Sequence, residues 1–199
     1  VFQNPDDQLF SASVYQDISF GAVNMGLPAE EVHRRVETVM EQVGITYLKD
    51  RPTHALSFGQ KKRVAFAGIM VMQPEVIILD EPTAGLDPKG RDEILDQIVY
   101  LHEKADMTVI LVSHSMEDIA KYVDRIIVMN KGSVMFNDVP KKVFAHYKEL
   151  ESVGLAAPQV TYIMHALKEK GMDVPTDATT IEEAADGIMK ALKKERAAK

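Results

Sequence analysis

The chain has 199 residues, 46% of them hydrophobic, which is enough for one sizeable core and a small appendage. A formal net charge of −7 argues against a general nucleic-acid-binding protein, because such proteins neutralise backbone phosphates with Lys and Arg. The absence of cysteine excludes a disulfide framework and a thiolate metal site, and no apolar run approaches the roughly 20 residues that cross a bilayer.

Two helical patterns stand out in the first part of the chain. Residues 29–43 place their valines and a methionine on one helical face, between a proline and a glycine that mark the ends. Residues 58–72 form the second pattern, with Ser57 as the expected N-cap. We therefore predict two amphipathic helices here.

Short apolar β-rich runs and helical patterns then alternate, which predicts an α/β fold with a parallel sheet. The predicted strands are residues 76–79, 108–112 and 126–129, and the helices between them are 89–104 and 115–122. The first strand has no polar residue, so we expect it to be buried on both faces. A turn at residues 130–133 predicts a hairpin that completes the sheet.

After Pro140 the composition changes, and helical patterns continue to the end of the chain. They cover residues 141–146, 159–170 and 181–195, and a capping box from Thr180 to Glu183 opens the last one. We predict two domains, an α/β domain over residues 1–149 and a helical extension over residues 150–199.

Polar residues follow two of the predicted strands directly. Asp80 and Glu81 come after the first strand, a turn brings back Asp87, and His114 follows the second strand. Ligands of open α/β sheets bind at these strand ends. A lone Asp-Glu pair is more often a solvated strand end, but the accompanying turn and histidine favour a metal or polyphosphate site. The phosphate loop G-x-x-x-x-G-K-[ST] does not occur in the chain.

The segment LSFGQKKR, residues 56–63, is a second candidate site. Ser57, Gly59 and Gln60 open a helix, and a helix N-terminus offers free N–H groups and partial positive charge to a phosphate. An ordinary cap followed by a basic turn is the alternative. Because basic residues in a first turn oppose the helix dipole, the anion site is the favoured interpretation.

Five motifs, in this order and spacing, resemble those of the ATPase subunit of an ABC transporter. They are VFQNPDDQLF (Q-loop), LSFGQKKR (signature), VIILDEP (Walker B), TAGLDP (D-loop) and VSH (switch histidine). The residues of the Q-loop segment, together with SVYQDISFG and LSFGQKKR, are most similar to those of the ATPases of energy-coupling-factor and cobalt or nickel importers. The resemblance covers residue 1 to about residue 144 and implies a partial P-loop NTPase sheet with a helical subdomain at about residues 5–72.

The resemblance also implies a role for each matching residue. Asp80 would hold Mg²⁺ through its water shell, and Glu81 would polarise the attacking water as general base. His114 would contact the γ-phosphate of ATP. Gln3 would contribute to the metal and the water while sensing the nucleotide.

Two ATPase domains close head to tail in this family. Ser57, Gly59 and Gln60 would therefore contact ATP bound to the partner subunit, and Asp87 would link the two sites. The implied partners are a second ATPase subunit, in a homodimer or heterodimer, a transmembrane coupling subunit and a solute-binding membrane subunit. The implied location is the cytoplasmic face of the cell membrane, with no nucleic acid involved.

The segment between the Q-loop and the signature motif is where a coupling helix of the membrane subunit docks in this family. The apolar residues available to line that groove are Leu9, Phe10, Val14, Ile18 and Phe20. For most of them, a place in the subdomain core is the expected alternative.

The sequence departs from the family pattern in two ways. Phe58 occupies a position that is glycine in the general pattern LSGGQ. The Walker A loop and the adenine-stacking aromatic residue lie upstream of the Q-loop in this family, whereas this chain begins at Val1. We expect a fragment of a longer ATPase, inactive and weak in Mg-ATP binding by itself; the alternative is a genuine short product.

The implied function is that of an ATP-binding and ATP-hydrolysing subunit that powers an importer for cobalt, nickel or a vitamin, a choice that the sequence leaves open. A non-catalytic ABC-like regulatory module is an alternative that the missing phosphate loop favours. A soluble ABC ATPase of DNA repair or translation is another. ABC ATPases of DNA repair have long heptad segments, and those of translation have two ATPase domains in tandem. The chain has neither feature.

Overall fold

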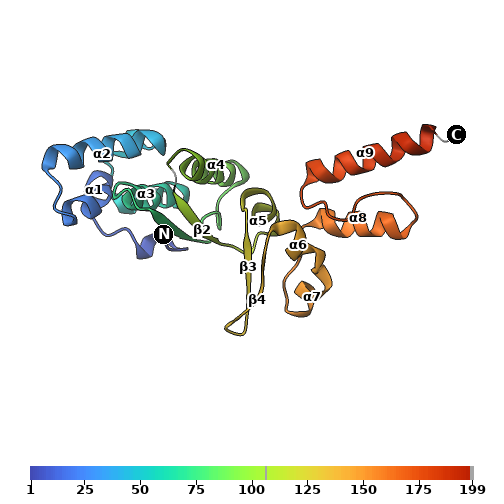
Figure 1. Ribbon diagram of the computed structural model, residues 1–199. Helices are drawn as coiled ribbons and strands as arrows, with labels where there is room; N and C mark the ends of the chain where they lie inside the picture. The colour runs from blue at the N-terminus through green and yellow to red at the C-terminus, as the bar shows by residue number, and fades with distance from the viewer. Residues whose placement is uncertain (106, 198–199) are drawn as a thin grey trace. The chain divides into compact units, whose positions relative to one another are not determined.

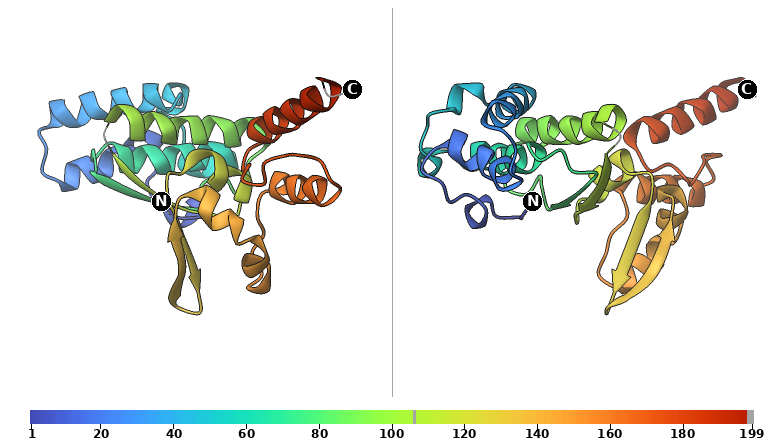
Figure 2. Two further views of the ribbon diagram at one scale, coloured as in Figure 1. Left: turned by 45° about the vertical axis from the view of Figure 1, so that its right-hand side comes forward. Right: turned by 60° about the vertical axis from the view of Figure 1, so that its left-hand side comes forward.

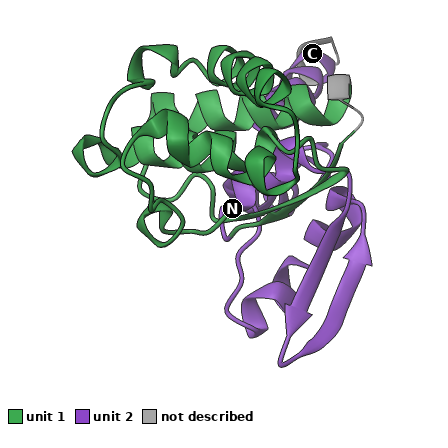
Figure 3. Cartoon of the chain, turned by 90° about the vertical axis from the view of Figure 1, so that its left-hand side faces the viewer, with its two compact units in different colours: residues 1–113 green, residues 114–199 purple. Residues whose placement is uncertain are grey.

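The computed structural model describes residues 1–105 and 107–197 (Figure 1). The chain divides into two compact units, Val1–Ser113 and His114–Lys199 (Figure 3). Each unit has helices and a two-stranded sheet of its own, so the predicted α/β class is confirmed. The domain boundary predicted after residue 149 stays a prediction.

Helices make up most of the first unit. They are α1 (Val14–Asn24), α2 (Ala29–Gln42), α3 (Phe58–Met70) and α4 (Pro88–Ala105), with short 3-10 turns at Pro5–Asp7, Thr46–Leu48 and Thr53–Ala55. Helices α2, α3 and α4 agree with the predicted ones to within two residues at each end. Helix α1 was not predicted, because its buried face includes the polar residues Asp17 and Ser19.

The core of the helical part comes from the apolar faces of α1, α2 and α3, which pack on one another (Figure 1). The predicted apolar face of α2 is buried, and its members are Val32, Val36, Val39, Met40 and Val43. Helix α1 adds Val14 and Ile18, which are fully buried. These two residues therefore belong to the core, as expected for most of the five apolar residues, and do not line a docking groove.

The sheet of the first unit consists of β1 (Val76–Asp80) and β2 (Thr108–Val112). The two strands are parallel, and α4 connects them along the chain. Their register pairs Asp80 with Val112, so both strands end at the same edge. On the other side of β1, the Val1 amino group donates to the Ile78 carbonyl at 2.8 Å, and Asp80 N–H donates to the Val1 carbonyl at 3.1 Å. Strand β1 is therefore hydrogen-bonded along both of its sides at this end.

Only one face of this strand pair is buried. Helices α3 and α4 cover the same side of the strands (Figure 2). Ile77 and Leu79 are buried, and Leu79 lines a small cavity with Phe66 of α3 and Ile94 of α4. On the opposite face, Val76 is 50% exposed and Ile78 is 56% exposed, and the apolar residues of β2 are exposed in the same way. The prediction that β1 is buried on both faces was wrong for the part of the chain that the structure describes.

The second unit carries a hairpin and five helices in its described residues. The hairpin pairs β3 (Ile126–Asn130) with β4 (Ser133–Asp138), and the helices are α5 (Met116–Tyr122), α6 (Pro140–Ala145), α7 (Tyr147–Ser152), α8 (Gln159–Glu169) and α9 (Ile181–Ala197). Lys131 and Gly132 have φ of 48° and 80°, as the favoured two-residue hairpin turn requires. The predicted hairpin is confirmed, but β3 and β4 pair with each other in a sheet of their own rather than completing the parallel sheet.

Two apolar clusters stabilise the second unit. One lies beside the hairpin and includes Val128, Val143, Phe144 and Leu150, and the other, between α8 and α9, includes Met164, Val174, Ala184 and Ala191. The start of α9 forms a modified version of the predicted capping box: Thr180 Oγ1 accepts from Glu183 N–H at 3.3 Å, whereas the Glu183 carboxylate accepts from Thr179 N–H at 2.9 Å. No helix among the described residues is long and apolar enough to span a membrane.

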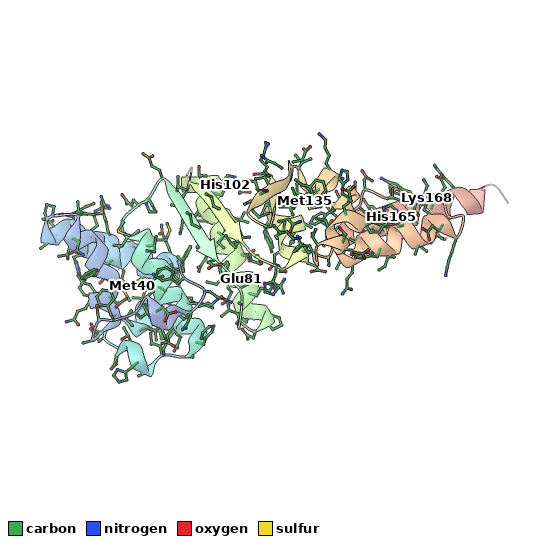
Figure 4. The ribbon with its side chains drawn as sticks, turned by 90° about the horizontal axis from the view of Figure 1, so that it is seen from below. Met40, Glu81, His102, Met135, His165 and Lys168 are labelled. Carbon is green, nitrogen blue, oxygen red and sulfur yellow. The ribbon has the colours of Figure 1, made fainter. Side chains whose placement is uncertain are left out.

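Met40 offers a test of the helical core, since its side chain is 0% exposed (labelled in Figure 4). Met40→Ala should lower the free energy of unfolding by about 2 to 5 kcal/mol, because it removes buried contacts and leaves a cavity. Chemical denaturation measures this change. Met25→Ala is the matched control, because Met25 is 53% exposed and its truncation should have little effect. Equal losses for the two variants would contradict the core described here.

Candidate functional site

The carboxyl end of β1 presents two adjacent acids in different environments. Asp80 is exposed, whereas Glu81 is half-buried (labelled in Figure 4). Glu81 N–H still donates to the Val112 carbonyl at 2.9 Å, so its backbone continues the β1–β2 ladder for one more residue. Its φ of 45° is in the left-handed region, which is uncommon for a residue with a side chain. The sheet and the turn therefore fix together where the Glu81 side chain starts.

Asp87 has a structural role that the structure shows directly. Its Oδ1 atom accepts a hydrogen bond from Gly90 N–H at 3.0 Å, and Pro88 follows as the first residue of α4. This is an N-cap, which satisfies a helical N–H group that has no partner within the helix. The predicted role of Asp87 in linking two subunits stays a prediction.

The acids do not form a metal cage of their own. Within the described part of the chain, no three His, Asp or Glu side chains converge in a way that would hold a metal ion. Magnesium keeps several waters and is bound through one or two carboxylates together with substrate phosphates. An exposed carboxylate such as that of Asp80 suits this type of site, with the remaining ligands coming from a nucleotide and water.

The N-terminus of α3 is closed by a capping box. Ser57 Oγ accepts from Gln60 N–H at 3.3 Å, and Gln60 Oε1 accepts from Ser57 N–H at 2.9 Å. The N–H groups of the first two helical residues, Phe58 and Gly59, have no acceptor within the helix by construction. These two N–H groups lie where the anion site of Ser57, Gly59 and Gln60 was predicted, and that site stays a prediction.

The three basic residues that follow in α3 contact other parts of the first unit. Lys61 forms an ion pair with Asp6 at 2.6 Å, and Arg63 forms one with Glu93 of α4. Lys62 is buried and donates to two backbone carbonyls of the turn after β1. A bound anion is therefore not needed to explain the basic sequence KKR.

Phe58, which replaces a glycine of the general signature pattern, packs on the turn between β1 and α4. A Cβ atom added to Gly85 would lie 2.9 Å from Phe58 Cε1, too close for a side chain. The φ of Gly85 is also positive, at 75°. Signature motif and D-loop are thus in direct contact, and the ring takes up the space beside a glycine that has no side chain.

Gln3 and His114 are both exposed, Gln3 near the start of the first unit and His114 just after its last residue. Gln3 lies in a segment that Gln8 holds in place, since Gln8 Oε1 accepts from Phe2 N–H at 3.3 Å and Gln8 Nε2 donates to the Ala65 carbonyl of α3 at 2.6 Å. His114 is the first residue of the second unit. The roles given to Gln3 and His114 stay predictions.

Several residues that position these elements were missed by the sequence interpretation. Gln8 fixes the Q-loop segment, and Asp17 Oδ1 accepts from Phe10 N–H and Ser11 N–H at 3.0 and 2.7 Å, which orders the chain before α1. Lys62 holds the turn at Glu81. Of these residues, only Lys62 had a signal in the sequence, because a positive charge close to the start of a helix opposes the helix dipole.

Known proteins resemble this chain over nearly its whole length. The sequence profile of the ABC transporter family matches residues 1–84. The energy-coupling factor transporter ATP-binding protein EcfA2 of Clostridium tetani is 53% identical over 192 residues, which are 96% of this chain and 67% of that protein. The chain belongs to the ABC transporter ATP-binding family.

Further similarities agree with this membership of the ABC family. EcfA2 of Caldanaerobacter subterraneus is 50% identical over 194 residues, covering 97% of this chain and 68% of the relative. The solved structure of CbiO1 from Clostridium perfringens, described as part of the ABC transporter complex CbiONQ, has a TM-score of 0.68 and 50% identity, covering 84% of this chain and 66% of that chain. The resemblance to energy-coupling-factor and cobalt importer ATPases is confirmed, and this family member spans about two thirds of the length of these relatives.

The N-cap at Asp87 should contribute to the stability of this ABC ATPase chain. Asp87→Ala should lower the free energy of unfolding by about 1 kcal/mol, because Gly90 N–H loses its acceptor. Asp87→Asn keeps an acceptor oxygen and should stay close to the parent chain in chemical denaturation. If both substitutions were equally destabilising, the carboxylate charge rather than the cap would be the source of the effect.

Proposed function

We propose that the chain carries the hydrolytic and partner-facing motifs of the ATPase subunit of an energy-coupling-factor-type importer, and that the assembled subunit hydrolyses Mg-ATP. The observation that carries the proposal is the Asp80-Glu81 pair, at the carboxyl end of a parallel strand, in a chain 53% identical to an EcfA2 protein. Residues at such strand ends contact ligands in open α/β sheets. The two acids have separate tasks, because one is exposed and the other is half-buried and held by backbone contacts.

Asp80 serves the metal-bound nucleotide. A bound Mg²⁺ would neutralise charge that develops on the phosphates during transfer. The exposed Asp80 carboxylate would hold this ion through its water shell, which agrees with the lack of a converging acidic cluster in the described residues. Gln3 would add an amide oxygen to the same shell.

Glu81 orients and deprotonates the attacking water. Its N–H bond to Val112 and the bonds of its carbonyl to Ala84 N–H and Lys62 hold the backbone from which the carboxylate projects. A general base needs such positioning because it must lie within hydrogen-bond reach of the water in the transition state. His114 contacts the γ-phosphate in the assembled site.

The N-terminus of α3 contacts the nucleotide of a partner ATPase subunit. The N–H groups of Phe58 and Gly59 point out of the helix start, where the dipole favours an anion. Ser57 and Gln60 hold this turn through their reciprocal hydrogen bonds and add polar atoms of their own. Asp87 follows Gly85 by two residues, and Gly85 contacts Phe58 of the signature segment. From this position, Asp87 links the two sites of the dimer.

A transmembrane coupling subunit contacts an aromatic pair of the helical subdomain. Phe10 and Phe20 pack edge to face with ring centroids 4.7 Å apart, and Phe10 is 66% exposed. Leu9 is half-buried next to them. Exposed paired aromatic rings are typical of protein interfaces, because they bury a large apolar area with little loss of side-chain freedom.

The solute of the importer is bound by a separate membrane subunit, and the ATPase works at the cytoplasmic face of the membrane. Cobalt, nickel or a vitamin is the proposed cargo. The support is the naming of the relatives: EcfA2 belongs to energy-coupling factor transporters, and CbiO1 to a CbiONQ complex. Reconstitution with candidate membrane subunits, followed by ATP-dependent uptake of each solute, tests this assignment.

Glu81 and Asp80 should fail in different ways when they are mutated in the intact gene product. Glu81→Gln keeps the shape but removes the basic oxygen, so ATP still binds and the dimer closes, while hydrolysis falls about 10²- to 10⁴-fold. Asp80→Asn should instead weaken magnesium-dependent nucleotide binding. ATP hydrolysis and nucleotide-dependent dimerisation, measured for both variants and the wild type, separate the two roles. Near-wild-type hydrolysis by Glu81→Gln would refute the general-base assignment.

Phe10→Ala should weaken assembly with the transmembrane subunit without unfolding the ATPase, because its ring is mostly exposed before assembly. We expect a loss of about 1 kcal/mol or more in binding free energy, typical of an aromatic interface residue. Co-purification and titration with the membrane complex measure it. Val134→Ala, at an exposed position of the hairpin, is the control. Unchanged assembly of Phe10→Ala would exclude the aromatic pair as the contact.

A further inference from the structure

Lys62 occupies an unusual environment for a lysine. Its side chain is 5% exposed and faces a small apolar cavity that is also lined by Leu79 and Ile94. Burial lowers the pKa of the Lys62 ammonium from its ordinary value, and the negative charge of Glu81 opposes that shift. An ammonium group in such surroundings is unfavourable unless it is hydrogen-bonded, so its bonding partners should explain its presence.

The partners of Lys62 are backbone carbonyls of the turn after β1. Nζ donates to the Glu81 carbonyl at 2.8 Å and to the Pro82 carbonyl at 3.0 Å. Its ammonium also lies 5.5 Å from the centroid of the Phe58 ring, within the range of a cation–π contact. All three partners belong to, or contact, the segment that presents the Glu81 carboxylate.

The backbone of Glu81 needs such support. With a φ of 45°, it adopts a conformation that residues with a side chain rarely take unless their surroundings enforce it. Two charge-assisted hydrogen bonds fix the carbonyl of the Glu81–Pro82 peptide bond and the Pro82 carbonyl that follows it. A shift of either carbonyl would change the backbone conformation at Glu81 and thus the direction in which its side chain projects.

Helix α3 therefore contacts the turn at two places. Lys62 holds its beginning, at Glu81 and Pro82, and the Phe58 ring packs on Gly85 further along. Both side chains come from the first turns of α3, next to the N–H groups assigned above to the nucleotide of the partner subunit. A movement of the α3 N-terminus is thus transmitted to Glu81 by two short contacts.

We propose that Lys62 is a positioning residue for hydrolysis: it sets the orientation of Glu81 and makes that orientation depend on the placement of the signature helix. The inference rests on the proposed function, since it assumes that Glu81 is the base and that α3 contacts the partner's ATP. It goes beyond that function by assigning a residue that connects the two. Engagement of one nucleotide by α3 then influences cleavage of the nucleotide that Glu81 serves.

The test uses Lys62→Met in the intact, assembled protein, because methionine fills similar space without a donor. We expect kcat for ATP hydrolysis to fall roughly 10- to 100-fold, with the KM for ATP nearly unchanged. Lys62→Arg keeps charge and donors and should recover most of the rate. Lys168→Met is the matched control, since Lys168 Nζ donates to the Val174 carbonyl in the second unit at 3.4 Å (labelled in Figure 4). A wild-type kcat for Lys62→Met would overturn the proposal.

A double-mutant cycle with Glu81→Gln distinguishes positioning from a general loss of structure. If Lys62 acts through Glu81, Lys62→Met should change the residual single-turnover rate of Glu81→Gln by less than about twofold. Full additivity of the two losses would overturn the proposal. If Lys62→Met does not fold, Lys62→Gln is put through the same cycle. Near-wild-type ATP hydrolysis by Glu81→Gln would refute the proposed base. Slow hydrolysis by Glu81→Gln together with wild-type hydrolysis by Lys62→Met would refute the positioning role alone.

Discussion

The first unit depends on the hydrogen bonding of β1. This strand is bonded to β2 on one side and to Val1 on the other, and the ladder continues to the Glu81 N–H. Because both neighbours fix the same end of the strand, backbone hydrogen bonds determine the place where Glu81 leaves the sheet. The turn, the α4 cap and the contacts of α3 are all built outward from that point.

The sequence was a good guide where local pattern and burial agree. The valine stripe of α2, the Ser57 cap and the turn at Lys131 and Gly132 each follow from short-range chemistry, and the structure contains all three. Motif order also identified the ABC family correctly, because five short segments were in register over most of the chain.

The failures have a shared physical cause, namely that they depended on contacts distant in sequence. Helix α1 was overlooked since its buried Asp17 is satisfied by loop N–H groups that no periodicity reveals. The basic residues after Gln60, among them Lys62, were taken as support for an anion site, although the partners of Lys62 lie 19 and 20 residues further along the chain. Residues 76–79 were expected to be covered on both faces, and an apolar run does not say which neighbours cover it.

The contact between Phe58 and Gly85 constrains how this sequence can diverge. Position 85 needs a residue that tolerates a positive φ, a condition that asparagine meets in many proteins. It must also lack a Cβ atom as long as an aromatic ring lies against it. Asparagine thus becomes acceptable at 85 only in a lineage that has first lost the ring at 58, so the order of the two substitutions matters. Relatives that keep the general LSGGQ pattern should be freer at this turn than those with phenylalanine.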